Sequence, residues 1–488
     1  MAKKEQLFYL IKSLTPAEKR YFRLFNQQNG DSNYLQLFEA IARQTEYDEA
    51  AIRRRFKKAP FLRQLHVTKN YLTRQILRSL RNYHGKLSRH AEVHDCLREV
   101  EILFLRELFD LCDSEIERGL KLARSYELWT ETLQLLGWQR RVLLASGNQQ
   151  DQEEALNAVG EEERSVLARL TRQAQFWDYS LNVFPRLIAS PGGLCDGHPL
   201  LGQSHPEDTQ QSRILHFYIT QTEHYFQRNM PAAAETATRL IAFLEERPEL
   251  IRENPHAYLT AHNNLIGILL QIRDYPRIGE LLTKIRAIFE KYRLSPDQPG
   301  SVKLLTHAFN VELEMYRDTG NVEAGIALIE TMTGFLARYV HLVSSGYLLM
   351  FYYQFAYLHF LAGENEKALH WLNEILGGDL QRGREVIVGY AHLLRLIIHY
   401  ELRNVMLLKY QVDSCRRFLK KKKRLNSYES ALLNFFARLS MAHPEKHHAI
   451  FVAFREQLLT EHPLESLKDH LDYLDFLGWI EDKCEELG

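Results

Sequence analysis

The chain has 488 residues and is poor in glycine and proline, with 24 and 14 respectively. Its length allows a large buried core, and the shortage of turn-forming residues favours long helices over a strand-rich fold. The five cysteines are odd in number and form no C-x-x-C pair, which argues against a disulfide framework and against a zinc ribbon. The N-terminal apolar run from Leu7 to Ile11 is too short for a signal-peptide core. The sequence therefore predicts a cytoplasmic protein.

Charge is balanced over the whole chain but not along it. The chain has 62 Lys and Arg against 62 Asp and Glu. Residues 1–91 contain 19 Lys and Arg and only 7 Asp and Glu, a net charge of +12, so the remainder carries −12. Such asymmetry predicts either an anionic partner for the basic part or docking of the basic part on the acidic part.

Residues 1–91 are predicted to form a basic helical domain. Thr15-Pro16-Ala17-Glu18 has the form of a capping box with proline at the first helical position, and further helices are expected from about Ser32 and over Asp48 to Lys58. The last helix of the domain is predicted over Val67 to Tyr83. A step of about 100° per residue gives this helix two faces. Its apolar face carries Leu72, Ile76, Leu80 and Tyr83, and its opposite face carries Arg74, Arg78 and Arg81.

The middle of the chain contains the strongest boundary signal. Residues 92–184 are expected to form long helices, broken at Ser146-Gly147-Asn148. Glycine and proline then crowd between Pro185 and Pro206, which predicts a loop over 185–210. This loop contains Cys195, His198 and His205, whose side chains can bind zinc, but their spacing matches no common zinc site. We therefore expect no metal there.

The segment 211–425 contains a repeat. Five helix-breaking tripeptides recur along it: Arg228-Asn229-Met230, Asp274-Tyr275-Pro276, Gly320-Asn321-Val322, Gly363-Glu364-Asn365 and Arg403-Asn404-Val405. Five positions that follow them are spaced 45, 47, 43 and 40 residues apart. These positions are Ala233, Ile278, Gly325, Ala368 and Leu408. Repeated helical hairpins of this size cannot bury their apolar faces alone and are stable when stacked, which predicts a solenoid. Residues 426–488 are expected to form capping helices, over Tyr428 to Leu439, His447 to Leu459 and Leu467 to Ile480.

One apolar segment has a length that could cross a bilayer. The 25 residues from Tyr339 to Gly363 contain no Lys, Arg, Asp or Glu. However, polar residues such as Gln354 and His359 interrupt the segment, and its tyrosines are scattered rather than gathered at its ends. A buried solenoid helix is the favoured interpretation, with no membrane contact.

The hairpin within this segment resembles a tetratricopeptide repeat. The resemblance rests on Tyr352, Phe355, Ala356, Ala368, Leu372 and Ile375, with small residues where the two helices would cross. Ile278 and Leu408 depart from the pattern, and the periods exceed the usual length of about 34 residues, so the units are tetratricopeptide-like. The stretches SLTPAEKRYFRLF and VTKNYLTRQILRSLRNY are similar to those of a group of uncharacterised bacterial helical-repeat proteins, which implies no established activity. The expected fold is all-α: a basic helical N-terminal domain followed by an α-solenoid of tetratricopeptide-like hairpins.

The resemblance implies a concave groove lined by residues that lie fifteen positions before the helix crossing. These positions are Tyr218, Asn263, Asn310, Tyr353 and Leu393. The amides of Asn263 and Asn310 could bind a peptide backbone beside the aromatic rings of Tyr353, Tyr357 and Phe360. The predicted groove residues are therefore these two asparagines and three aromatic residues, Asn263, Asn310, Tyr353, Tyr357 and Phe360. The alternative is that they belong to the core or the outer face, because a shift of one residue in register would move all of them.

A second candidate site lies in the basic N-terminal domain. The residues predicted to bind an anionic partner are Arg53, Arg55, Lys69, Arg74, Arg78 and Arg81. Arginines on the solvent side of a helix could neutralise nucleic-acid phosphates, although no helix-turn-helix turn and no base-reading residues are recognisable. A protein partner, the acidic half of the chain itself, or simple solvation of the face are the alternatives.

Motifs of common enzymes are missing from the sequence. It contains no GxxxxGK[ST], GxGxxG, GxSxG or HExxH pattern. We therefore expect a non-catalytic scaffold or adaptor, without cofactor or metal, that binds a peptide or protein in a solenoid groove. The alternative is a nucleic-acid-binding regulator with a basic N-terminal head and a repeat domain that senses a peptide or protein.

Overall fold

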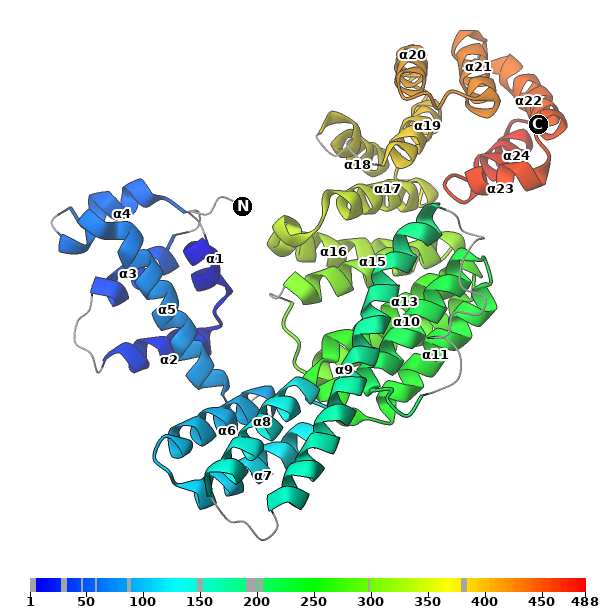
Figure 1. Ribbon diagram of the computed structural model, residues 1–488. Coiled ribbons are helices and arrows are strands. Elements are labelled where there is room, and N and C mark those ends of the chain that lie inside the picture. The colour runs from blue at the N-terminus through cyan, green and yellow to red at the C-terminus, as the bar shows by residue number, and fades with distance from the viewer. Residues whose placement is uncertain are drawn as a thin grey trace. The chain divides into compact units, whose positions relative to one another are not determined.

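The computed structural model describes residues 6–27, 33–44, 47–57, 59–85, 89–146, 152–189, 200, 205–296, 299–378 and 384–488. Within these residues all regular secondary structure is helical and no strand occurs (Figure 1). The prediction of an all-α fold is therefore confirmed. The chain divides into two compact units, Met1–Asn254 and Pro255–Gly488, each of which is described by itself.

The N-terminal helices of the first unit surround one central helix. They are α1 (Gln6–Ser13), α2 (Pro16–Gln27), α3 (Asn33–Ala42), α4 (Glu49–Arg55), the 3-10 helix η1 (Pro60–Gln64) and α5 (Leu65–His84). α5 contacts α1, α2, α3 and η1, and the core between them includes Phe22, Phe38, Leu72 and Ile76. Because Leu72 and Ile76 are fully buried, these two residues of the predicted apolar face hold the domain together. Leu80 is partly buried, but Tyr83 is 38% exposed, so the buried part of this face does not reach the end of α5.

The structure confirms one local prediction for these helices and corrects another. The capping box is confirmed: the Thr15 amide donates to Glu18 Oε2 at 2.7 Å, and the Glu18 amide donates to Thr15 Oγ1 at 3.2 Å. The helix predicted over Asp48 to Lys58 is shorter than expected. Asp48 is its N-cap, but the helix ends at Arg55 because the chain turns into η1, which begins at Pro60. Lys58 lies outside the described residues.

The rest of the first unit consists of helices that pack in chain order. They are α6 (Arg89–Phe104), α7 (Phe109–Ser125), α8 (Trp129–Ser146), α9 (Gln152–Ala189), α10 (Gln210–Phe226), α11 (Met230–Glu245) and α12 (Pro248–Glu253). α9 continues through Pro185, so the loop predicted over 185–210 begins too early; one proline removes a single hydrogen bond from a long helix without having to end it. Cys195 and His198 lie outside the described residues.

The second unit continues the same arrangement. Its helices are α13 (Pro255–Gln271), α14 (Tyr275–Lys291), α15 (Pro299–Asp318), α16 (Val322–Tyr339), the 3-10 helix η3 (Val340–Leu342), α17 (Ser345–Leu361), α18 (Asn365–Gly377), α19 (Glu385–Glu401), α20 (Val405–Lys421), α21 (Ser427–Met441), the 3-10 helix η5 (Pro444–Lys446), α22 (His447–Glu461), α23 (Leu464–Leu471) and α24 (Phe476–Leu487). From α13 to α22, each α-helix contacts the next. In addition, α13, α15, α17 and α19 contact one another in series (Figure 1). α13, α15, α17 and α19 therefore form a continuous row, against which α14, α16, α18 and α20 pack.

The five predicted helix breaks all separate two helices. At each break one residue has a positive φ, from 55° to 73°. These residues are Arg228, Arg273, Gly320, Gly363 and Arg403. The amide of the next residue then bonds to a carbonyl five positions earlier, as from Glu364 to His359 at 2.8 Å. This is the Schellman closure, which satisfies the last carbonyls of one helix and turns the chain toward the next.

The five predicted crossing positions are buried, and Gly325 shows why small residues occur among them. Ala233, Ile278, Ala368 and Leu408 are all at most 1% exposed. A Cβ atom on Gly325 of α16 would lie 2.9 Å from Leu358 Cδ2 of α17, closer than van der Waals contact permits. A side chain at position 325 would therefore require the buried Leu358 side chain to shift, whereas glycine lets the two helices lie this close without such a shift.

The apolar segment from Tyr339 to Gly363 is not one helix. α16 ends at Tyr339, and α17 begins at Ser345 with Ser344 as its N-cap. α17 contacts α15, α16, α18 and α19, which explains why a helix in this position is apolar on all sides. In the part of the chain that the structure describes, no helix has both the length and the apolarity needed to cross a membrane.

The last predicted helix, Leu467 to Ile480, is divided in two. α23 ends at Leu471 and α24 begins at Phe476, because Asp475 acts as an N-cap and accepts a hydrogen bond from the Gly478 amide at 2.9 Å. The short non-helical segment 472–475 between them takes part in the site described below.

Candidate functional site

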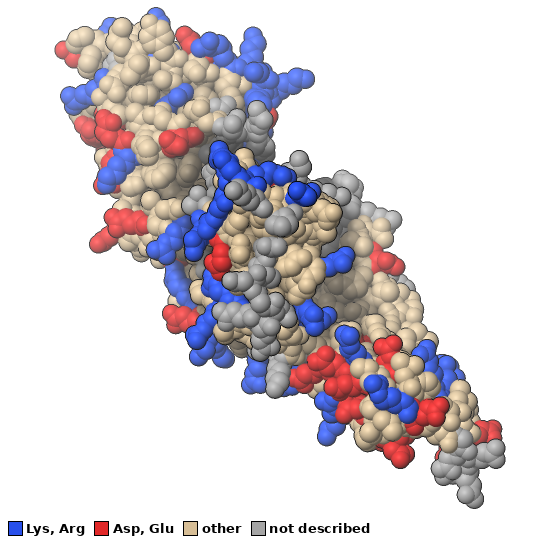
Figure 2. Space-filling model, turned by 90° about the vertical axis from the view of Figure 1, so that its left-hand side faces the viewer, with Lys and Arg blue, Asp and Glu red and all other residues tan. Residues whose placement is uncertain are grey.

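The exposed side of α5 presents an arginine cluster. Arg74, Arg78 and Arg81 lie together on this side and are exposed. Figure 2 shows the side of the molecule on which the N-terminal helices lie, and lysine and arginine predominate over them. Among the described residues, none of the three arginines forms an ion pair with a carboxylate. Val67 and Leu77 are 58% and 52% exposed on the same helix, so the face offers apolar contact as well as charge.

The other three predicted anion-binding residues are engaged to different degrees. The ammonium group of Lys69 lies 2.6 Å from Glu49 Oε2 and also contacts the Tyr47 hydroxyl, and only 14% of this side chain is exposed. This contact lowers the pKa of Glu49 to about 2. Arg53 pairs with Glu49 at 2.9 Å, whereas Arg55 is exposed beside Phe56. Lys69 therefore joins α4 to α5 and is not available to a partner, while the arginines of α5 are.

The two predicted groove amides are buried between helices. Asn263 of α13 is 3% exposed and Asn310 of α15 is 5% exposed. Asn263 Nδ2 donates to the Leu304 carbonyl of α15 at 3.0 Å, and His307 Nε2 donates to the Asn263 carbonyl at 3.0 Å. These reciprocal hydrogen bonds join α13 to α15. The Asn263 amide nitrogen is thus engaged by the chain's own backbone.

The predicted groove tyrosines of α17 hold a segment of the same chain. The Tyr353 hydroxyl donates to the Tyr473 carbonyl at 2.8 Å, and the Asp475 amide donates to the Tyr357 hydroxyl at 2.9 Å. Tyr390 of α19 stacks on Tyr473 with ring centroids 4.8 Å apart. The sequence predicted that the asparagine amides bind backbone and that the aromatic rings lie beside them. In the structure the tyrosine hydroxyls bind backbone, and this backbone is the chain's own segment between α23 and α24.

A cleft with a volume of about 1320 Å³ lies beside this segment, within the second unit. Its apolar lining is made by Tyr357, Phe360, Leu361 and Trp479, together with Val322 and Leu471. Two of the five predicted groove residues, Tyr357 and Phe360, thus line one open space. Asn263 instead borders a smaller cleft of about 530 Å³, and Tyr353 and Asn310 are not among the residues that line the larger one.

The larger cleft has an excess of acidic side chains. Its acidic residues are Asp318, Glu401, Asp472, Asp475, Asp482 and Glu486, and its basic residues are Arg273, Arg317, Lys468 and Lys483. Three of the basic side chains are paired: Arg273 with Asp472 at 2.5 Å, Arg317 with Asp318 at 2.6 Å, and Lys483 with Glu401 at 2.8 Å.

The acidic surroundings also affect a neighbouring carboxyl group. Burial raises the pKa of Glu314, and the charges of Asp318 and Asp472 raise it further against the opposing effect of Arg317. Burial is the largest cause of this shift, so the negative character of the cleft rests on its lining, which has six acidic and four basic side chains. Such a cleft is electrostatically suited to a cationic ligand.

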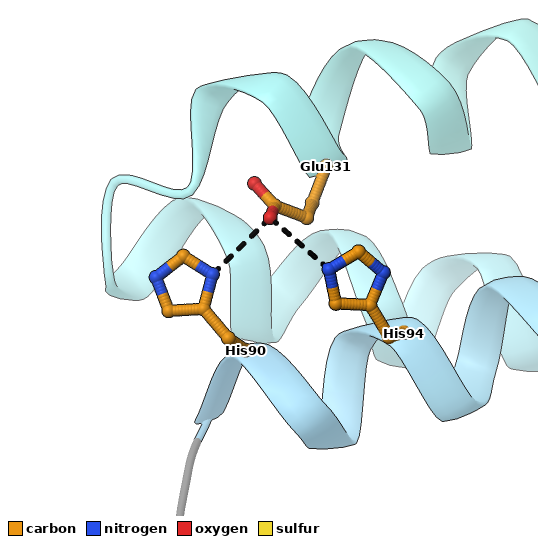
Figure 3. Close-up of side chains that lie close together, drawn as sticks. All are labelled: His90, His94 and Glu131. Atoms are coloured by element: carbon orange, nitrogen blue, oxygen red, sulfur yellow. Dashed lines mark hydrogen bonds and ion pairs between the residues drawn. The ribbon is translucent and has the colours of Figure 1, made fainter. Parts of the chain in front are cut away.

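A third group of residues was missed by sequence reasoning. His90 and His94 of α6 point toward Glu131 of α8 (Figure 3). The only local signal was two histidines four positions apart on a predicted helix, which places both on one face. Glu131 follows 37 residues after His94, so its proximity depends on how α8 packs against α6.

Comparisons with known proteins give no further assignment. The chain matches none of the protein-family models and none of the curated proteins with which it was compared. Its function is therefore argued from the surfaces described above.

Proposed function

We propose that the chain is a non-catalytic scaffold or adaptor, whose second unit binds a cationic peptide segment of a partner protein. The observation that carries the proposal is the cleft of about 1320 Å³ with its apolar lining and its acidic excess. Pockets for small molecules usually have volumes of about 300 to 1000 Å³, so this space suits a larger, extended ligand. Charge complementarity would speed association and select the partner, and apolar contacts would supply affinity.

The proposal includes a tetratricopeptide-like α-solenoid. Three observations support it: the row of contacts from α13 to α19, the recurring Schellman closures, and the buried residues at the five repeat positions. Solenoids of this kind bind extended segments along surfaces formed by successive repeats. The cleft lies where the turns that precede α16 and α18 face α23 and α24, as the presence of Gly320, Gly363 and Asp482 in its lining indicates.

The chain's own segment 472–475 indicates how a peptide would be held. Two tyrosine hydroxyls of α17 bind its backbone rather than its side chains, which is independent of sequence. A partner peptide in the adjoining cleft would add specificity by placing an apolar side chain against Phe360 and Leu361 and a basic side chain beside Asp482. Asp482 is exposed and forms no ion pair within the described part of the chain.

Peptide selection tests this proposal. A random peptide library displayed on phage is selected against the full chain, and peptides with a basic residue near an apolar one are expected to be enriched. The double variant Asp482→Lys/Glu486→Lys reverses two charges of the cleft and should weaken binding of an enriched peptide by at least about tenfold. The matched control is Glu280→Lys/Glu290→Lys, which reverses two exposed charges on α14. Equal binding by both double variants would contradict the proposal.

A second candidate function is nucleic-acid binding through α5. The observation that favours it is the exposed cluster of Arg74, Arg78 and Arg81 without carboxylate partners among the described residues. If all three contact phosphates, replacing them by alanine should reduce the slope of log K against log salt by about 2 to 3. The matched control replaces Lys420, Lys421 and Arg424, which are exposed at the end of α20 and just after it. Equal loss in both triple variants would indicate non-specific charge effects and would exclude α5 as the site.

A further inference from the structure

Two histidines and one glutamate converge from neighbouring helices of the first unit. His90 and His94 are one turn apart on α6, and Glu131 is the third residue of α8. His90 Nδ1 lies 3.1 Å from Glu131 Oε1, and His94 Nε2 lies 3.5 Å from the same oxygen (Figure 3). All three potential ligand atoms lie within 4.8 Å of one another. The side chains therefore meet at one point rather than in separate pairs.

These distances agree with the edges of a metal coordination polyhedron. Zinc bonds to histidine nitrogen and carboxylate oxygen are about 2.0 to 2.2 Å long. In a tetrahedral site, atoms at that distance from the metal are about 3.3 to 3.6 Å apart. The observed 3.1 and 3.5 Å lie at or near this range. The three atoms are therefore close enough together for one ion to bind all of them.

The charge of Glu131 provides an independent argument for a cation. Its side chain is only 11% exposed, and the ion-pair partners shown for its carboxylate within the described residues are the imidazoles of His90 and His94. A carboxylate withdrawn from water requires a positive charge nearby. Histidine provides that charge only when it is protonated, whereas a divalent ion provides it with neutral imidazoles.

The site is accessible from solvent. The side chains of His90 and His94 are 55% and 58% exposed, so an ion can enter without unfolding of the helices. Three protein ligands leave a fourth position for water, as in open zinc sites, whereas structural zinc sites usually have four protein ligands. Imidazole and carboxylate together favour zinc and similar transition metals over magnesium or calcium.

We propose that His90, His94 and Glu131 bind one divalent transition-metal ion, with zinc as the preferred species, and leave one coordination position to water. The ion would join α6 to α8 and stabilise the first unit. This inference is independent of the cleft in the second unit and of the arginines of α5.

Metal titration of the full chain tests the proposal. Metal-free protein is titrated with Co²⁺, whose visible absorption is intense in a tetrahedral site, and bound Co²⁺ is then displaced with Zn²⁺. One equivalent is expected to bind. Removal of one ligand, in His94→Ala or Glu131→Gln, should weaken binding by more than the 10- to 100-fold typical of residues that only orient ligands. His66→Ala, which removes an exposed histidine of α5, should leave the affinity unchanged.

Thermal unfolding with and without Zn²⁺ gives a second readout, since an ion that binds only the folded state raises its stability. The unfolding temperature of the parent chain and of His66→Ala should rise with Zn²⁺, while those of His94→Ala and Glu131→Gln should not. The proposal is overturned if no stoichiometric Co²⁺ binding occurs. It is also overturned if the ligand variants bind the metal as tightly as the parent chain, because other groups would then hold the ion.

Discussion

The arginine cluster of α5 is predicted from helical spacing and the groove residues of α13, α15 and α17 from the register of the repeat, and the structure places the two sets very differently. Arg74, Arg78 and Arg81 are exposed. Asn263 and Tyr353 are at most 3% exposed and bind the chain's own backbone. On an amphipathic helix the charged face is the solvent face, so spacing places these three arginines correctly, although it does not show that Glu49 engages Lys69 of the same helix. On a helix such as α17, which is apolar all round, spacing cannot distinguish a groove from a core.

The largest expected effect is a loss of stability at acidic pH. It arises from a histidine that is buried in the second unit, whereas the arginines of α5 are exposed. Burial, together with the charge of Arg395, lowers the pKa of His392 from 6.5 to about 3. Between these two pH values the unfolded chain binds a proton that the folded chain does not bind, so stability falls as the pH falls from 6.5 toward 3. At pH 4 the loss from His392 is about 3 kcal/mol relative to pH 8.

Urea unfolding of the parent chain and of His392→Gln at both pH values measures this effect. The variant should lose less stability on acidification, and His443→Gln, at an exposed site, should behave as the parent chain does. An identical pH dependence in all three proteins would show that His392 is not kept neutral by burial.

Replacement by alanine should destabilise the protein much more at the predicted groove residue Asn263 than at Arg81 of α5. Asn263→Ala leaves the Leu304 carbonyl without its partner between α13 and α15 and should lower the free energy of unfolding by about 1 to 3 kcal/mol. Arg81→Ala should change it by less than about 0.5 kcal/mol. Urea unfolding compares the two. Similar small values for both would mean that the Asn263 amide faces solvent and remains available as a clamp.

The two glycines of α16 should respond differently to replacement by alanine, because only Gly325 faces another helix closely. Gly334→Ala adds a methyl group in open space on an exposed part of the helix and should stabilise the protein by about 0.5 to 1 kcal/mol. Gly325→Ala places its Cβ 2.9 Å from the buried Leu358 side chain and should lie about 1 to 2 kcal/mol below Gly334→Ala. Thermal unfolding of the two variants gives the difference. Equal stabilisation would show that α16 and α17 do not cross closely at this position.

The smallest expected effect concerns the hydroxyl groups that bind the segment between α23 and α24. Tyr357→Phe removes the acceptor of the Asp475 amide and should cost about 1 kcal/mol. Hydrogen exchange at Asp475 should become faster in this variant. Tyr410→Phe, at a side chain that is 67% exposed, is the control and should leave that exchange rate unchanged. Unchanged exchange in both variants would indicate that α17 does not hold the segment.

Much of the fold could be predicted from the sequence because its signals are local. The capping box at Thr15, the apolar stripe of α5 and the helix breaks such as Gly363-Glu364-Asn365 depend on residues within a few positions of one another. The division of the last helix at Asp475 was missed, since no glycine or proline marks it.

The sites depend on contacts between residues far apart in the sequence, which spacing does not reveal. Tyr353 meets Tyr473, which follows 120 residues later. Glu49 engages Lys69, which spacing alone had placed among the free basic residues. Glu131 meets His90 only because α8 returns beside α6. In each case the packing of helices, rather than a motif, decides which side chains are available.

The central claim is that the cleft beside α23 and α24 binds a cationic peptide. Hydrogen–deuterium exchange of the full chain, with and without a peptide enriched by selection, tests it most directly. We expect protection of the turn at Gly363 and of residues 471–482, with no change in α5. Protection confined to α5, or no protection near the cleft, would contradict it.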